Sequence, residues 1–155
     1  MKRHLAYLRY LLAHKKWVYV AGRQLGLSRW RLLIHDWHKF LPGEWFPYAE
    51  AFYNPDGTKS KYAEREPFKH AWNRHQKRGR HHWQAWVLVW DRGDVEPLEM
   101  PLVFAAEMVA DWHGAGRAIT GKWDTASWYA RNKDKIRLHP KTRELVEKLL
   151  TLEIE

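Results

Sequence analysis

The chain contains no cysteine among its 155 residues. This absence excludes a disulfide framework and any thiolate metal site, so His, Asp and Glu remain as possible metal ligands. No apolar run approaches the roughly 18 residues that a membrane-spanning helix needs. Charged residues interrupt the leucine-containing N-terminus too often for the apolar core of a signal peptide. We therefore expect a cytoplasmic protein without a membrane segment.

Acidic residues are also the minority, with 18 Asp and Glu against 27 Lys and Arg, for a net charge of +9. Such a surface attracts anions, which include nucleic acid, nucleotides and other phosphates. Much of the excess lies in residues 69–82, KHAWNRHQKRGRHH. A solvated basic face without a partner is an equally good interpretation of this segment.

The chain does have what a folded core requires, because 45% of its residues are hydrophobic and eleven are Trp. Its length suits one domain, which we expect to span residues 1–155. Apolar residues recur mainly with helical spacing. The expected helices cover residues 1–22, 28–40, 44–53, 63–77, 101–112, 124–136 and 140–152. Residues 86–90 fit a helix or a short strand, and 54–62 and 91–100 are expected loops. The sequence thus predicts an all-α bundle of about six or seven helices.

The stretch LIHDWHKF, residues 33–40, crowds two imidazoles, a carboxylate and an ammonium into five positions. In the expected helix, His35 and Asp36 are about 100° apart and can reach one point beside the helix. Lys39 follows His35 by one turn on the same side. The pattern indicates a metal anchor with a cation beside it, although a hydrogen-bonded capping pair is the alternative.

Further candidate ligands lie on other expected helices. His14 falls on the apolar stripe of the first helix, where a core histidine with satisfied hydrogen bonds is the alternative. Asp111 lies among apolar residues of the helix 101–112, and an unpaired buried carboxylate is costly. A cation would explain its position. Glu107, one turn earlier, either orients a ligand histidine or pairs with Arg117.

In order along the chain, His14, the doublet His35-Asp36 and Asp111 resemble the H…HD…D pattern of the HD-domain metal-dependent phosphohydrolases. HDWHK is similar to the HDxxK form of the two-metal branch, in which further histidines lie between the doublet and the last Asp. The resemblance covers residues 14–111, about two thirds of the chain. The Gly-Tyr-Pro element of the cyclic-dinucleotide phosphodiesterases is absent. Stretches such as HHWQAW and EMVADWHGAGRA also resemble a small uncharacterised family of bacterial and phage proteins.

The resemblance implies an HD-like helical domain that binds one or two divalent transition metal ions, Mn, Fe, Co, Ni or Zn. Asp36 would bridge the ions, and a metal-activated hydroxide would attack a phosphate ester. The implied ligands are His14, His35, Asp36, His75, His81, His82 and Asp111. For the three later histidines, a surface position in a basic segment is an equal alternative.

Other side chains are candidates for handling the substrate. Lys39 and Asp36 are the expected catalytic residues, with Lys39 pairing with a phosphate oxygen or protonating a leaving group. Arg has a fork geometry suited to phosphate, and Trp can stack on a base. The candidate binding residues are Lys77, Arg78, Arg80 and Trp37. Trp83 is an alternative stacking residue, but tryptophans are more often part of the core.

Three functions fit the sequence. The first is a metal-dependent phosphohydrolase acting on a nucleotide or another small phosphate ester. The second keeps the metal but uses oxygen, since the ligand pattern also resembles the HD-domain di-iron oxygenases. The third is a basic helical protein that binds nucleic acid without a metal. The sequence leaves the oligomeric state open, a homo-oligomer included.

Overall fold

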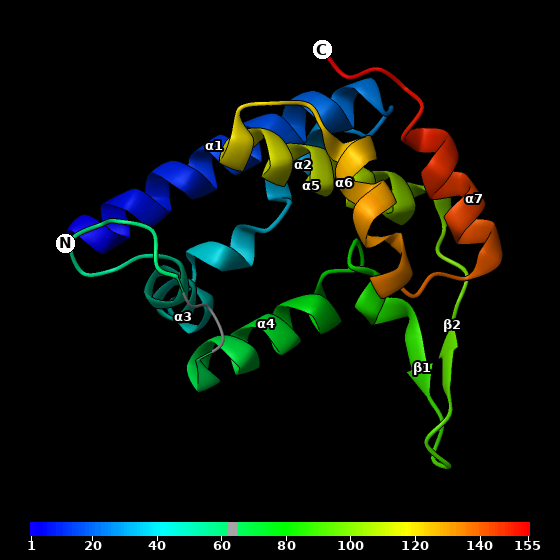
Figure 1. Cartoon of the computed structure of the whole chain (residues 1–155), viewed down its shortest axis with the longest axis horizontal. Helices are drawn as coiled ribbons and strands as arrows, with labels where there is room; N and C mark the ends of the chain where they lie inside the picture. Colours follow the sequence, from blue (N-terminus) through cyan, green and yellow to red (C-terminus); the bar gives the residue numbers. More distant parts are fainter. Residues whose placement is uncertain (62–64) are drawn as a thin grey trace.

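The computed structural model describes residues 1–61 and 65–155, and it is mostly all-α, as predicted (Figure 1). The α-helices are α1 (Lys2–Gln24), α2 (Arg29–Ile34), α3 (Pro42–Phe52), α4 (Glu66–Arg78), α5 (Leu102–Thr120), α6 (Thr125–Asn132) and α7 (Pro140–Leu149). Short 3-10 helices are η1 (Trp37–Phe40), η2 (Trp83–Trp86) and η3 (Lys133–Lys135). Within the described ranges, no helix combines the length and the apolar character that crossing a membrane requires.

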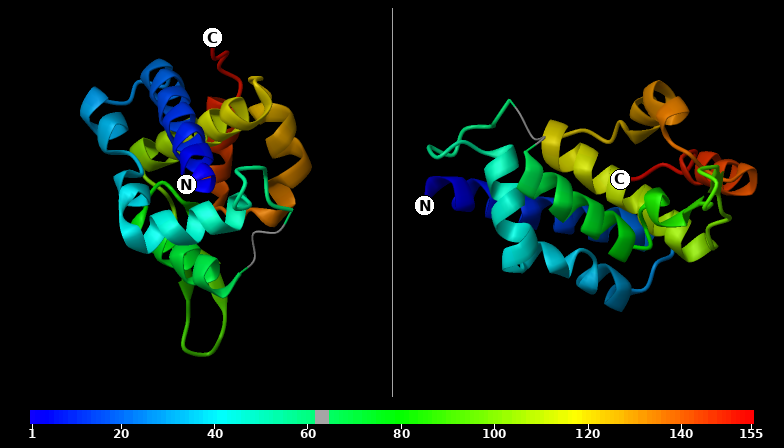
Figure 2. Two further views of the ribbon diagram at one scale, coloured as in Figure 1. Left: turned by 90° about the vertical axis from the view of Figure 1, so that its left-hand side faces the viewer. Right: turned by 90° about the horizontal axis from the view of Figure 1, so that it is seen from below.

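The long helices α1 and α5 pack against each other and form the spine of the molecule (Figure 2). Gly114 of α5 lies directly against Val18 of α1. A Cβ atom at Gly114 would be 2.3 Å from Val18 Cγ2 and 2.7 Å from Val18 N. Only glycine therefore permits this approach of the two helix backbones. The pair α3 and α4 packs together beside α1.

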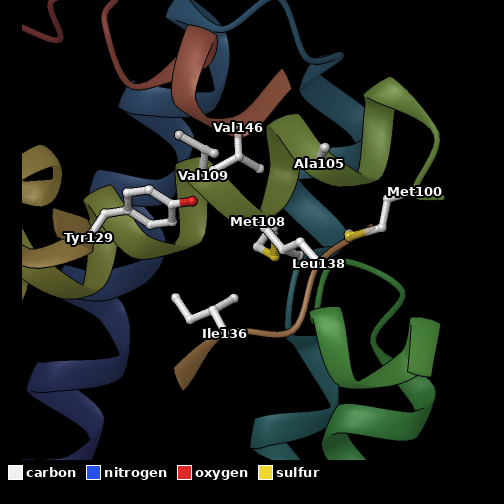
Figure 3. Packing of buried hydrophobic residues seen from close by; sticks show 8 residues of the cluster. All are labelled: Met100, Ala105, Met108, Val109, Tyr129, Ile136, Leu138 and Val146. Carbon is white, nitrogen blue, oxygen red and sulfur yellow. The ribbon is translucent and has the colours of Figure 1, made fainter. Parts of the chain in front are cut away.

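The main hydrophobic core lies where α5, α6 and α7 meet (Figure 3). Its buried residues are Met100, Ala105, Met108, Val109, Tyr129, Ile136, Leu138 and Val146. Thr142 of α7 is buried and its Oγ1 accepts a hydrogen bond of 2.9 Å from the Met100 backbone N–H. A separate aromatic cluster, built around Tyr7, Leu11 and Tyr48, joins α1, α3 and α4. Together these clusters hold α1, α4 and α5 in fixed positions around the centre described below.

The expected helix over residues 28–40 is wrong in its second half. Ser28 caps α2 as expected, its Oγ accepting from Arg31 N at 3.3 Å. However, α2 ends at Ile34, because His35 is extended and Asp36 has a left-handed backbone with φ of 54°. The Lys15 ammonium donates hydrogen bonds to the carbonyls of Leu33 and His35, which the end of the helix leaves without helical partners.

Other boundaries differ in ways that packing explains. The ambiguous run at 86–90 contains β1 (Val87–Val89), which pairs antiparallel with β2 (Val95–Pro97) inside an expected loop. This hairpin projects from the helical body (Figure 1). Helix α5 continues past the expected end at Trp112 because Gly114 packs against α1. Pro42 occupies the first turn of α3, where its missing N–H costs nothing. The expected start of the next helix, at residue 63, lies outside the described residues.

Candidate metal centre

All seven predicted metal ligands meet in the interior of the structure. They come from four helices and the segments that follow them: His14 from α1, the doublet from the end of α2, His75 from α4, the pair 81 and 82 from the loop after α4, and Asp111 from α5. The six other than Asp111 are buried, and the side chain of Asp111 is 13% exposed. The surface alternative for His75, His81 and His82 is therefore wrong.

Four of these side chains form what we call the first ligand set: His14, His35, Asp36 and Asp111. Asp111 Oδ1 lies 3.1 Å from His14 Nε2 and 3.2 Å from His35 Nε2. Asp36 Oδ2 lies 3.5 Å from His35 Nε2 and 3.8 Å from His14 Nε2. Ligand atoms that share one ion at about 2.0–2.2 Å are themselves about 3.0–3.6 Å apart. The set has nearly this spacing.

The second ligand set consists of Asp36, His75, His81 and His82. Its carboxylate oxygen is Asp36 Oδ1, which lies 3.4 Å from both His75 Nε2 and His81 Nε2. Asp36 thus presents Oδ2 to the first set and Oδ1 to the second. This is the arrangement that a carboxylate bridging two ions requires.

Two glutamates hold the histidines from behind. Glu107 Oε1 is 3.0 Å from His35 Nδ1, and Glu44 Oε2 is 2.9 Å from His75 Nδ1. Such contacts fix the ring so that Nε2 faces the metal. Glu107 also accepts from Arg31 at 2.8 Å. Of its two expected partners, a candidate ligand histidine lies beside it, whereas Arg117 donates to the Gly121 carbonyl. Glu44 was missed, because nothing in its local sequence indicates a partner 31 residues away.

Several polar atoms of the two sets lack hydrogen bonds. In residues 1–61 and 65–155, the buried Nε2 atoms of His75, His81 and His82 have no hydrogen-bond partner. Buried polar atoms normally have one, and each exception calls for an explanation. Imidazole nitrogens and carboxylate oxygens at this spacing are ligands for divalent transition metals. The residues therefore fit a metal ion.

Without metal, charges within the cluster balance one another. Burial would lower the pKa of His35, but the carboxylates of Asp36, Asp111 and Glu107 raise it to about 10. Burial opposes ionisation of Asp36, yet His35 and Lys39 hold its pKa well below the usual range. Burial lowers the pKa of His81 to about 4, with help from the charge on His35. The two sets thus differ in protonation before any metal binds.

Lys39 lies beside the shared carboxylate, with Nζ 2.6 Å from Asp36 Oδ2. Burial would lower its pKa, but Asp36 and Asp111 raise it above the ordinary value for lysine. Lys39 therefore carries its proton and its charge at neutral pH. Of its two expected roles, this favours pairing with an anionic oxygen over giving up a proton.

A cavity of about 220 Å³ borders the centre at Asp36, His75 and His81. We call it the arginine cavity. Its other lining residues are Arg31, Ile34, Trp37, His38, Arg78, Gly79, Arg80, Phe104 and Glu107. Three of the four predicted binding residues, Trp37, Arg78 and Arg80, therefore line it, and Arg31 was missed. Lys77 does not line it, because its Nζ donates to the Gln84 carbonyl at 3.3 Å. Trp83 packs against the main core instead.

A second cavity, of about 210 Å³, borders the centre at His14, His82 and Asp111. We call it the aromatic cavity. Its other lining residues are Tyr7, Tyr10, Lys39, Tyr48, Phe52, Phe68, Trp72 and Ala115. None of these aromatic residues was a predicted site residue, because their approach to the centre depends on how α1, α3 and α4 pack.

Comparison with known proteins gives one match. The model of a family described as "Family of unknown function (DUF5662)" matches residues 3–152. No curated protein and no solved structure matches the chain. The match covers nearly the whole sequence, including every residue of the two ligand sets.

Proposed function

We propose that this chain, which belongs to the family of unknown function DUF5662, is a metal-dependent phosphohydrolase that acts on a nucleotide or another small phosphate ester. The observation that carries the proposal is the pair of ligand sets joined by Asp36 and bordered by the arginine cavity. The proposed ions are one or two of Mn, Fe, Co, Ni or Zn. The HD-domain resemblance supports the proposal, and a cytoplasmic location remains a prediction.

The chain's own residues would divide the work as follows. Bound divalent ions lower the pKa of water enough to provide a hydroxide nucleophile near neutral pH. Arg78 and Arg80 would hold the anionic substrate in the arginine cavity, since guanidinium groups bind phosphate oxygens in pairs. The charged Lys39, fixed by Asp36, would stabilise negative charge as it develops on the phosphoryl oxygens.

The aromatic cavity favours a second candidate, a di-iron oxygenase. A carboxylate-bridged, histidine-rich pair of sites suits iron, and an apolar cavity beside it could admit an uncharged substrate. An iron-derived absorption band and oxygen consumption would distinguish it. The third expectation was that residues 69–82 bind nucleic acid. Three histidines of this segment are buried and cannot contact a nucleic acid. The segment retains exposed cations such as Lys77, Arg78 and Arg80.

The first test is metal content, measured by elemental analysis on untagged protein. We expect one or two equivalents of a transition metal. Phosphate release is then measured with that metal from nucleoside monophosphates, p-nitrophenyl phosphate and bis(p-nitrophenyl) phosphate. Arg78→Ala and Arg80→Ala should raise KM, whereas the neighbouring Lys77→Ala serves as the matched control. Protein that holds none of the five metals and takes none up contradicts the proposal.

A further inference from the structure

The aromatic cavity contains two tyrosine hydroxyl groups that the protein itself does not satisfy. Tyr7 is fully buried and Tyr48 is 3% exposed. Across the described parts of the chain, neither hydroxyl oxygen has a hydrogen-bond partner. Both side chains line the cavity. Because buried hydroxyls are nearly always hydrogen-bonded, these two indicate a missing polar partner inside the cavity.

In contrast to the arginine cavity, the aromatic cavity has no arginine among the described residues that line it. Its one lysine, Lys39, already pairs with Asp36 at 2.6 Å. The carboxylate that borders this cavity is Asp111, a member of the first ligand set. Burial keeps the tyrosine hydroxyls protonated by raising the pKa of both. The two tyrosine hydroxyls are therefore the donors that the cavity offers to an occupant, which suits a neutral group with acceptor oxygens.

The remaining walls are flat and apolar. Phe68 stacks with Trp72 and meets Tyr48 edge to face, with ring centroids 5.1 Å apart in the second pair. Phe52, Phe68 and Trp72 are partly exposed, so this wall of the cavity lies near the surface. Aromatic faces bind the apolar faces of planar bases and of sugar rings. A purely apolar molecule would leave the two hydroxyls unsatisfied.

We infer that the aromatic cavity binds the uncharged, hydroxyl-bearing ring of the substrate, such as a nucleoside, while the arginine cavity binds its charged part. This inference rests on the proposed function, because it divides one phosphate ester between two cavities that border the same metal centre. His14, His82 and Asp111 border one cavity, and Asp36, His75 and His81 border the other. The inference therefore places the phosphate between these two groups of residues.

The test measures binding and not turnover. Uridine, adenosine and ribose are titrated calorimetrically into the metal-loaded protein, and inorganic phosphate is titrated separately. We expect saturable binding of at least one of the nucleosides. Tyr7→Phe and Tyr48→Phe should weaken it by about tenfold each, since each removes one donor while keeping the ring. Phosphate binding should not change in these variants.

Matched variants complete the design. Arg78→Ala should weaken phosphate binding and leave nucleoside binding unchanged. Tyr129→Phe is the control for loss of a buried tyrosine hydroxyl elsewhere, because Tyr129 donates to Glu147 in the main core. Circular dichroism confirms that each variant is folded.

The outcomes separate this inference from the proposed function. If neither nucleoside nor ribose binds at millimolar concentration, or if both Tyr→Phe variants bind like the parent, the inference is overturned even where phosphate esters are hydrolysed. Nucleoside binding that depends on the two tyrosines supports the inference. If the protein shows such binding but hydrolyses no phosphate ester with any of the metals, the proposed phosphohydrolase function is overturned and the binding site is not.

Discussion

The two ligand sets share Asp36 but differ in charge and in origin. The first set has two carboxylates and two histidines and joins α1, α2 and α5, whereas the second has the shared carboxylate and three histidines and depends on α4 and its following loop. A divalent ion receives more compensating charge in the first set. We therefore expect the first set to bind its ion more tightly and the second to lose its ion first.

The largest effect should come from removing the residue that both sets share. Asp36→Asn keeps the shape of the side chain, and asparagine tolerates the left-handed backbone at this position better than alanine does. Elemental analysis should show that both ions are lost, and hydrolysis should fall by at least about a thousandfold. Asp56→Asn, an exposed loop carboxylate, is the control. Normal metal content in Asp36→Asn would exclude the bridging arrangement.

Substitutions confined to one ligand set should remove one ion and leave the other. Asp111→Asn is expected to lose the ion of the first set, and His82→Ala that of the second. Metal content measured during dialysis against a chelator should then fall to at most one equivalent in each variant. His82→Ala should retain its ion at higher chelator concentrations than Asp111→Asn. The opposite order would show that carboxylate number does not decide affinity here.

The outer glutamates should give smaller effects. Loss of such a partner typically weakens metal binding by about 10- to 100-fold. We expect Glu107→Gln to exceed Glu44→Gln, because Glu107 contacts His35, Arg31 and, at 3.6 Å, His81. Glu50→Gln, a half-exposed partner of Arg3, is the control. Chelator competition gives the metal affinities. Equal affinities for all three variants would show that Glu107 and Glu44 do not support metal binding.

The smallest expected effect is a difference between the two ligand sets in how metal affinity depends on pH. In the metal-free protein the pKa of His35 is raised to about 10, so an ion entering the first set must displace a proton at neutral pH. Affinity there should fall about tenfold for each unit of acidification below that value. In the second set the pKa of His81 is lowered to about 4, so this histidine needs no deprotonation above about pH 5.

The two single-set variants make this pH difference measurable. Chelator competition in His82→Ala at about pH 6, 7 and 8 reports the first set, and Asp111→Asn reports the second. A steep dependence is expected only in His82→Ala. Equal slopes in both variants would contradict the protonation difference.

The sequence selected the seven candidate ligands because each combined a metal-binding side chain with an apolar face or with the HD pattern, and the structure brings all seven together. It did not predict the end of α2 at Ile34. Helical spacing continues through Phe40, and the break depends on Lys15 holding the exposed carbonyls and on the left-handed Asp36. Both ligand oxygens of Asp36 face their sets only after this break. The sequence thus selected residues that do meet in the interior, but it assigned the doublet the wrong local geometry.

The residues that surround the ligands could not be predicted for a different reason. Glu44, Arg31 and Tyr48 each act across a gap of many residues, and their positions depend on how helices pack. Helix α5 shows the same limit, since Gly114 and Gly116 indicate a helix end at the local level. Contact with α1 overrides that preference.

The glycine contact between α1 and α5 also fixes the separation of two candidate ligands. Val18 lies one helical turn after His14, and Gly114 lies three residues after Asp111. A methyl group at Gly114 would act as a wedge that forces the two backbones apart and stretches the 3.1 Å gap between His14 Nε2 and Asp111 Oδ1. An amino acid that cannot itself bind a metal thus sets the distance between two candidate ligands, and any preference of this site for ions of one radius would depend on that distance.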